Sequence, residues 1–170
     1  DNKTPIQRQV RIMQEICQYI TDTTGSANSV YYSVENNTLG EAALVVISEI
    51  GEENIRGVFL SETARAGNVR RFRKGFNTTN KSKLTACSKL KSLIETRRMT
   101  IASKALISEL KTFVAHGSSF AAKIGETDDL IMSTLLALRM MQTLQNYDAN
   151  LDAEIKDSNE FIEPMPFIMI

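Results

Sequence analysis

Apolar side chains recur every three or four residues near the start of the chain, which is the spacing of an amphipathic helix. They are Ile6, Val10, Met13, Ile16, Cys17 and Ile20. Thr4 followed by Pro5 is typical of a helix start, because threonine can cap the first turn and proline fits its first position. The pattern predicts a helix from about Pro5 to Asp22, followed by a turn of small polar residues.

A strand that ends at Glu35 is predicted next. Its side chains are the β-branched and aromatic types that suit a sheet. They are Val30, Tyr31, Tyr32 and Val34, and the turn residues Asn36, Asn37 and Gly40 follow. In open α/β sheets, ligands bind at the carboxyl ends of the strands. Glu35 is therefore either a solvated turn acid or a carboxylate that faces a functional site.

Four further helices are predicted from apolar periodicity and from capping residues. They cover Glu41–Ile50 with Gly51 as C-cap, Asn80 to about Ile94, Ser103 to Gly117, and Asp128 to about Tyr147 with Thr127 as cap. In the second of these, the expected apolar face is Leu84, Cys87, Leu90 and Ile94, with Lys83 and Lys91 off that face.

Short strands are predicted between these helices, at Arg56–Leu60, Met99–Ala102 and, more weakly, Phe120–Ile124. Strands that alternate with helices favour an α/β fold with a largely parallel or mixed sheet. We expect one domain over 1–150 and a C-terminal tail over 151–170 that is acidic and then apolar.

Composition supports a globular chain. With 170 residues, of which 42% are apolar, the chain can fill one hydrophobic core. No apolar run approaches the roughly 20 residues that span a bilayer, and the polar start carries no signal-peptide pattern, so we expect a soluble intracellular protein. Cys17 and Cys87 form no Cys-x-x-Cys or Cys/His cluster, which predicts reduced core thiols, with neither zinc nor a disulfide.

The net charge of zero hides a separation of charges. Residues 63–94 contain no Asp or Glu but nine bases, which are Arg65, Arg70, Arg71, Arg73, Lys74, Lys81, Lys83, Lys89 and Lys91. Such a stretch attracts anions, and each phosphate contact releases counterions. The block is either a solvated surface or a phosphate-binding region, and phosphate binding is the reading we favour because nine like charges repel one another.

Asp128 and Asp129 open the last predicted helix. Acids in a first turn complement the helix dipole, which is one sufficient reason for their presence. Carboxylate oxygens are also the ligands that Mg²⁺ and Mn²⁺ prefer. With Glu35 they could hold a metal that activates water for phosphodiester cleavage.

Four strings in order along the chain resemble one family. They are VENNTLGEAAL from Val34, GFNTTNKSKLTACSKLKSLIE from Gly75, ETDDLIMSTLLALRMM from Glu126 and PMPF from Pro164. Together they resemble the C-terminal nuclease domain of the large terminase subunit of tailed bacteriophages, most closely the T4-like ones, over nearly the whole chain. The resemblance implies a ribonuclease H-like mixed sheet flanked by helices, and an endonuclease that cuts concatemeric viral double-stranded DNA with Mg²⁺ or Mn²⁺.

The resemblance also implies roles for individual residues. Glu35 corresponds to the acid at the end of the family's fourth strand, and Asp128 to its late essential metal ligand, with Asp129 as a possible helper. Lys81 and Lys83 fall in a basic stretch that could contact the DNA. His116 is expected to be a helix-end or solvated histidine and not a general base. The implied partners are DNA, the portal and the small terminase subunit, in the cytoplasm of the infected bacterial host.

One departure from the family pattern concerns the start of the chain. The family begins with a hairpin sheet whose first strand carries an aspartate that bridges the metals, and no such segment precedes Thr4 here. Asp1 is a poor substitute, so we expect a domain truncated before the strand that ends at Glu35, with weak or no cleavage from this polypeptide alone. No G-x-x-x-x-G-K-[ST] motif of an ATPase motor occurs either.

Two other functions remain open. The chain could be a DNA-binding or assembly module without catalysis, in which an exposed sheet edge near Val30 supports dimerisation or strand exchange. It could also be another ribonuclease H-like enzyme, such as a resolvase or integrase. Such an enzyme would share the acids but not the GFNTTNKSK and PMPF strings.

Overall fold

The structure is a computed structural model that describes residues 3–26, 30–62 and 74–157, and the side chains only as far as residue 145 in the last helix. Helices and short strands alternate along it, which confirms the mixed character expected from the sequence. The elements are α1 (Ile6–Thr24), β1 (Tyr31–Tyr32), α2 (Thr38–Ile50), the 3-10 turn η2 (Glu52–Asn54), β2 (Val58–Phe59), α3 (Asn80–Glu95), α4 (Lys104–Thr112), β3 (Phe113–His116), β4 (Ser119–Ala122) and α5 (Asp129–Asp157).

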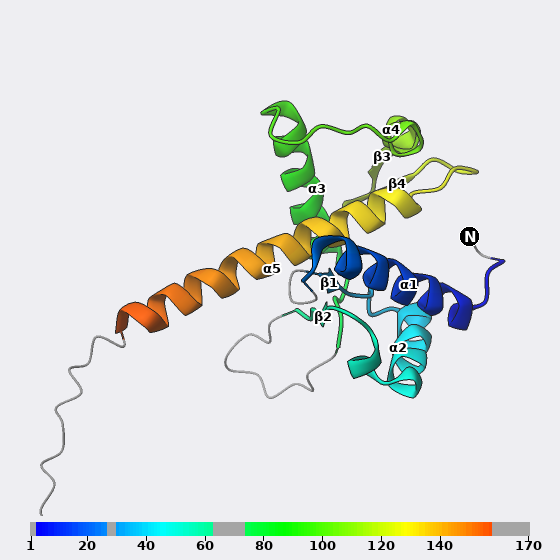
Figure 1. Ribbon diagram of the computed structural model, residues 1–170. Helices are drawn as coiled ribbons and strands as arrows, with labels where there is room; N and C mark the ends of the chain where they lie inside the picture. Colours follow the sequence, from blue (N-terminus) through cyan, green and yellow to red (C-terminus); the bar gives the residue numbers. More distant parts are fainter. Residues whose placement is uncertain (1–2, 27–29, 63–73, 158–170) are drawn as a thin grey trace, which may run out of the picture.

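Two hydrophobic clusters lie on either side of the long helix α5. Figure 1 shows α5 crossing the molecule, with α3, α4 and the β3–β4 hairpin on one side and α1, α2, β1 and β2 on the other. Each described sheet has two strands: β1 pairs with β2 in parallel, and β3 pairs with β4 antiparallel.

The first cluster packs α1 and α2 against the β1–β2 pair. Its buried members are Val10, Cys17, Val30, Tyr32, Ile47 and Ile55. The Tyr32 and Phe59 rings meet edge to face with centroids 5.3 Å apart, which fixes the register of the two strands. The helix predicted from Pro5 is confirmed, although Pro5 occupies the N-cap position. The helix ends at Thr24, two residues later than expected, and Gly25 follows as a left-handed C-cap.

The second cluster packs α3, α4 and the hairpin against α5. Its buried members are Ala86, Leu90, Leu106, Ile131, Leu135 and Leu138. Ser103 caps α4 as predicted, since its hydroxyl accepts a hydrogen bond from the Leu106 amide at 3.3 Å. Helix α5 extends to Asp157, beyond the predicted end near Tyr147.

The predicted helix from Ser103 to Gly117 is wrong in its second half. Phe113 to His116 form strand β3, which pairs residue by residue with β4, so the weak strand prediction near Phe120 is confirmed. The stacked rings of Phe113 and Phe120, with centroids 5.9 Å apart, stabilise the pairing. Gly117 has φ +58°, so this glycine makes the hairpin turn instead of ending a helix.

The strand predicted at Met99–Ala102 is also wrong. These residues adopt no regular structure, and the side chains of Met99 and Ile101 pack on the second cluster as the chain passes from α3 to α4. Their apolar character therefore reflects burial of individual side chains and not sheet pairing.

The predicted inner face of α3 needs correction. Ala86 and Leu90 are buried, whereas Leu84 and Ile94 are exposed. Lys83, expected off the apolar face, points inward, because its ammonium pairs with the carboxylate of Asp128 at the start of α5. The helix is capped by Thr79 and not by Asn80: Thr79 and Ser82 exchange hydrogen bonds in a capping box.

The two cysteines are free thiols, as predicted, with Cys17 buried and Cys87 half-buried. Burial raises the pKa of both thiols, and at Cys87 the nearby Lys83 ammonium opposes that rise in pKa. Within the part of the chain that the structure describes, no helix is both long and apolar enough to cross a membrane.

Candidate functional site

Glu35 lies in the segment that connects β1 to α2. Glu35 forms a parallel β-bridge with Phe76. The Phe76 backbone amide donates to the Val34 carbonyl at 3.0 Å, and the Asn36 backbone amide donates to the Phe76 carbonyl at 2.7 Å. The half-buried Glu35 carboxylate accepts a hydrogen bond from the side-chain amide of Asn37 at 3.1 Å. The strand predicted to end at Glu35 is shorter in the structure: β1 ends at Tyr32, and Glu35 lies beyond its carboxyl end in an isolated bridge.

The sequence predicts Gly40 in the turn before the helix, whereas the structure places it in the first turn of α2. Asn37 is the N-cap of this helix, and its side-chain oxygen accepts from the Gly40 amide at 2.9 Å. A Cβ on Gly40 would lie 1.6 Å from the Glu35 carbonyl oxygen. Only glycine therefore allows the helix to begin so close behind Glu35.

Lys83 and Asp128 form the second part of the site. The Lys83 ammonium lies 3.6 Å from an Asp128 carboxylate oxygen, and these two side chains are only 16% and 28% exposed. The same ammonium lies 5.5 Å from the centre of the Phe113 ring, so a cation–π contact helps to hold it. The start of α3 is thereby joined to the start of α5.

Arg139 is a buried charge that the sequence analysis missed. It is 9% exposed and forms an ion pair with Glu62 at 3.2 Å. Its guanidinium also donates to the Asn77 carbonyl at 3.0 Å and to the Thr78 hydroxyl at 3.3 Å, and it lies 5.2 Å from the centre of the Phe76 ring. One sequence signal could have found it, because Arg139 continues the apolar stripe that runs through Ile131 and Leu135.

These parts surround a small hollow between the two clusters. Its free volume of about 10 Å³ has room for about one water molecule. Its lining is apolar apart from one threonine, one carboxylate and two bases: Glu35, Thr78, Lys83, Ala86, Met132, Leu135, Leu136 and Arg139. Lys83 therefore lines the hollow together with Glu35, and its ammonium is paired with Asp128, which does not line the hollow.

Asp129 occupies a different position from its neighbour. It is exposed in the first turn of α5, whereas Asp128 is half-buried and ion-paired with Lys83. Among the described residues, no three His, Cys, Asp or Glu side chains form a group that could hold a metal ion. The structure thus pairs Asp128 with Lys83, places Glu35 in the lining of the same hollow as Lys83, and leaves Asp129 on the surface.

Two carboxylates are a suitable partial ligand set for Mg²⁺. This ion usually keeps several waters and is held by one or two carboxylates together with substrate phosphates. Glu35 and Asp128 meet that requirement in chemistry, and their partly buried surroundings strengthen any charge interaction there. In the structure, the charge that balances Asp128 is the ammonium of Lys83.

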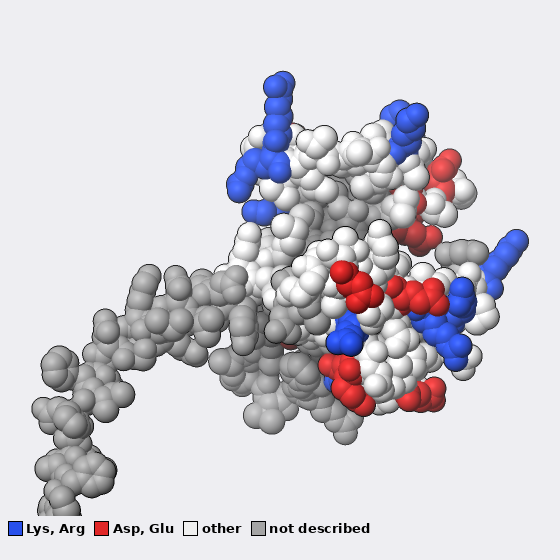
Figure 2. Space-filling model, in the orientation of Figure 1, with Lys and Arg blue, Asp and Glu red and all other residues white. Residues whose placement is uncertain are grey.

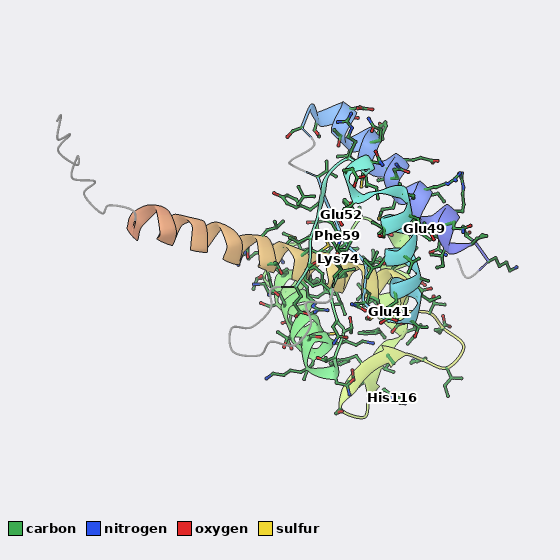
Figure 3. All side chains as sticks on the ribbon, turned by 90° about the horizontal axis from the view of Figure 1, so that it is seen from below. Glu41, Glu49, Glu52, Phe59, Lys74 and His116 are labelled. Carbon is green, nitrogen blue, oxygen red and sulfur yellow. The ribbon has the colours of Figure 1, made fainter. Side chains whose placement is uncertain are left out.

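The predicted basic block is only partly described. Arg65, Arg70, Arg71 and Arg73 lie outside the described residues. Lys74 is ion-paired with Glu52 and lies 5.8 Å from the centre of the Phe59 ring, and Figure 3 shows these three side chains together. Lys81 is exposed at the start of α3. Figure 2 shows further Lys and Arg side chains projecting from the end of α3 and from α4.

His116 is exposed and lies near the turn of the hairpin, as Figure 3 shows. The sequence expectation of a solvated histidine is confirmed, although this histidine belongs to a strand and not to a helix end.

A comparison of the sequence with the known protein families finds no matching family.

Proposed function

We propose that this chain forms part of a ribonuclease H-like, divalent-metal-dependent endonuclease domain, of the kind found in the large terminase subunit of tailed bacteriophages. Its substrate would be concatemeric double-stranded DNA, and its partners the portal and the small terminase subunit in the host cytoplasm. The observation that supports the proposal is the place of Lys83, which lines a hollow with Glu35 and pairs with Asp128. The resemblance of the four strings implies metal-binding roles for these two acids.

In this proposal, Glu35 and Asp128 hold the cation. A bound Mg²⁺ or Mn²⁺ would activate water and stabilise the leaving oxygen of the phosphodiester. Asp129, exposed one residue further on, would assist through solvent or through the bound phosphate. The Lys83 ammonium, whose residue lines the hollow, would attract the DNA phosphate as the cation replaces it beside Asp128.

The basic block would position the duplex. Lys81 is exposed beside the site, and Lys74 is the described residue that lies closest in sequence to the arginines. Contacts from lysine and arginine to phosphates add affinity without sequence preference. DNA-binding roles are proposed for Arg65, Arg70, Arg71, Arg73, Lys74, Lys81 and Lys83.

Nicking of supercoiled plasmid DNA by the full-length protein that carries this chain tests the proposal. Glu35→Gln and Asp128→Asn should each lower the Mn²⁺-dependent rate by more than the roughly 100-fold that loss of an outer-shell partner costs. Glu126→Gln is the control, since it removes an exposed acid two residues from Asp128. Retained nicking in both site variants would refute the proposed function.

A non-catalytic assembly module is the second candidate, and the β1 strand favours it. Among the described strands, β1 pairs only with β2, so its other edge is available to a further strand. In this alternative a second copy of the chain would pair there and the acids would bind no metal. Light scattering would show a concentration-dependent dimer, whereas a monomer mass at every concentration would exclude this alternative.

A further inference from the structure

The first turn of α5 is capped by a residue from another helix. Glu109 of α4 accepts hydrogen bonds from the backbone amides of Leu130 at 2.9 Å and Ile131 at 3.1 Å through one carboxylate oxygen. Its other oxygen accepts a hydrogen bond from the Thr127 hydroxyl at 3.3 Å. Thr127 is predicted to be the cap of this helix, but in the structure its hydroxyl donates to Glu109 instead.

This arrangement fixes the position of Asp128. The first amides of a helix have no partner within the helix and need an acceptor from elsewhere. Most helices take that acceptor from the residue just before them, which leaves the helix free to shift as a body. Here the bonds to Glu109 bracket Asp128 on both sides, at Thr127 and at Leu130, and tie it to α4.

The same tie connects α4 to the proposed metal ligand. Asp128 is the residue whose carboxylate meets Lys83 at 3.6 Å, and Phe113, which lies 5.5 Å from the same ammonium, directly follows α4. A local shift of the first turn of α5 would move Asp128 before it moved Ile131, because Asp128 precedes the helix and Ile131 is buried in the second cluster. The Glu109 carboxylate resists such a shift.

We propose that Glu109 is a positioning residue that directs the Asp128 carboxylate toward Lys83, which lines the hollow together with Glu35. The geometric part of this inference stands on the hydrogen bonds alone. Its consequence for metal affinity rests on the proposed function. Glu109 does not touch the cation or the DNA in this account, and acts only through the first turn of α5.

Mn²⁺ titration of the 170-residue chain, followed by paramagnetic broadening of the Asp128 amide signal in NMR spectra, tests the consequence. Glu109→Ala should weaken Mn²⁺ binding at Asp128 by about 10- to 100-fold, the usual effect of losing a residue that orients a ligand. Glu109→Gln keeps an acceptor oxygen for the two amides and should restore most of the affinity. Glu126→Gln removes a nearby exposed charge and should leave the affinity within about twofold, because exposed charges interact weakly through water.

Equal weakening in all three variants would show an effect of charge and would overturn the positioning role. Wild-type affinity in Glu109→Ala would overturn it as well. If the unmodified chain binds no Mn²⁺ at Asp128, the proposed function is refuted, because it requires a metal there. The geometric part of the inference is then tested by crystal structures of the variants. In Glu109→Ala the distance from Lys83 to Asp128 should then exceed 4 Å while Glu109→Gln keeps it near 3.6 Å. An unchanged distance in Glu109→Ala would refute the inference.

Discussion

The ammonium of Lys83 and the carboxylate of Asp128 form an ion pair, 3.6 Å apart, between the first turns of two helices that the sequence separates widely. Both side chains are mostly covered by protein, and the Phe113 ring lies beside the ammonium. This pair links the basic region of the chain to the acid that the proposed metal would use. Its energetic value and its role in the site can be tested separately.

The first prediction concerns the stability that this pair provides. Lys83→Met keeps an apolar stem against Phe113 but leaves Asp128 without its counter-charge, so the free energy of unfolding should fall by about 1 kcal/mol at pH 7. Urea denaturation measures the change. Lys91→Met is the matched control on the same helix: its pair with Glu95 is exposed, and its loss should cost less than about 0.5 kcal/mol. Equal losses in the two variants would show that the Lys83 pair has no special value.

The second prediction concerns the close approach of α2 to Glu35. Gly40→Ala would place a Cβ 1.6 Å from the Glu35 carbonyl oxygen, so the start of α2 and Glu35 must move apart. Helix propensity alone would make this change stabilising by about 1 kcal/mol, and a loss of stability would therefore identify the clash. Thermal unfolding should show a lower midpoint for Gly40→Ala. Ala42→Gly, in the same helix, provides the reference for propensity without a clash. A Gly40→Ala variant more stable than the parent would contradict the observed geometry.

The third prediction concerns the buried phenol of Tyr32. Burial, and after it the negative charge of Glu52, raises the pKa of Tyr32 from 10.0 to about 12. The folded state therefore keeps the phenol proton to a higher pH than the unfolded state. Stability should be constant with respect to this group below pH 10 and should fall by about 2 kcal/mol as the pH rises from 10 to 12.

Two variants isolate that effect. Tyr32→Phe should flatten the fall above pH 10, and at neutral pH it should be neutral or slightly stabilising, because the buried hydroxyl has no hydrogen-bond partner among the described residues. Tyr31→Phe removes a phenol that is 41% exposed and should keep the wild-type pH dependence. Denaturant unfolding at several pH values measures all three proteins. Parallel curves for the wild type and Tyr32→Phe above pH 10 would exclude the assignment.

Local signals in the sequence predicted much of the fold. The apolar spacing of α1 and the serine cap of α4 depend on neighbouring residues, and the structure confirms both. The strand predicted to end at Glu35 ends at Tyr32, and Glu35 follows it in an isolated bridge. The helix prediction is wrong at Phe113 and Val114, because they continue the apolar period of α4 although their partners are across the hairpin. Helical periodicity does not reveal strand partners that lie nine and seven residues further along the chain.

The site was less predictable because long-range contacts build it. Glu35 and Asp128 were identified from the sequence, but the inward turn of Lys83 depends on a carboxylate of another helix. The cap of α5 comes from Glu109, whose own surroundings in the sequence give no sign of that role. Arg139 is buried because Glu62, Asn77 and Thr78 together satisfy its guanidinium, and those residues come from a different part of the chain.

Anomalous diffraction from crystals of this chain soaked in Mn²⁺ tests the central claim most directly. The account predicts a manganese peak within coordination distance of the carboxylates of both Glu35 and Asp128, with Lys83 displaced from its place beside Asp128. Asp128→Asn crystals, soaked in the same way, should lack the peak. A saturating soak that leaves both carboxylates without manganese and the Lys83 pair intact would contradict the account.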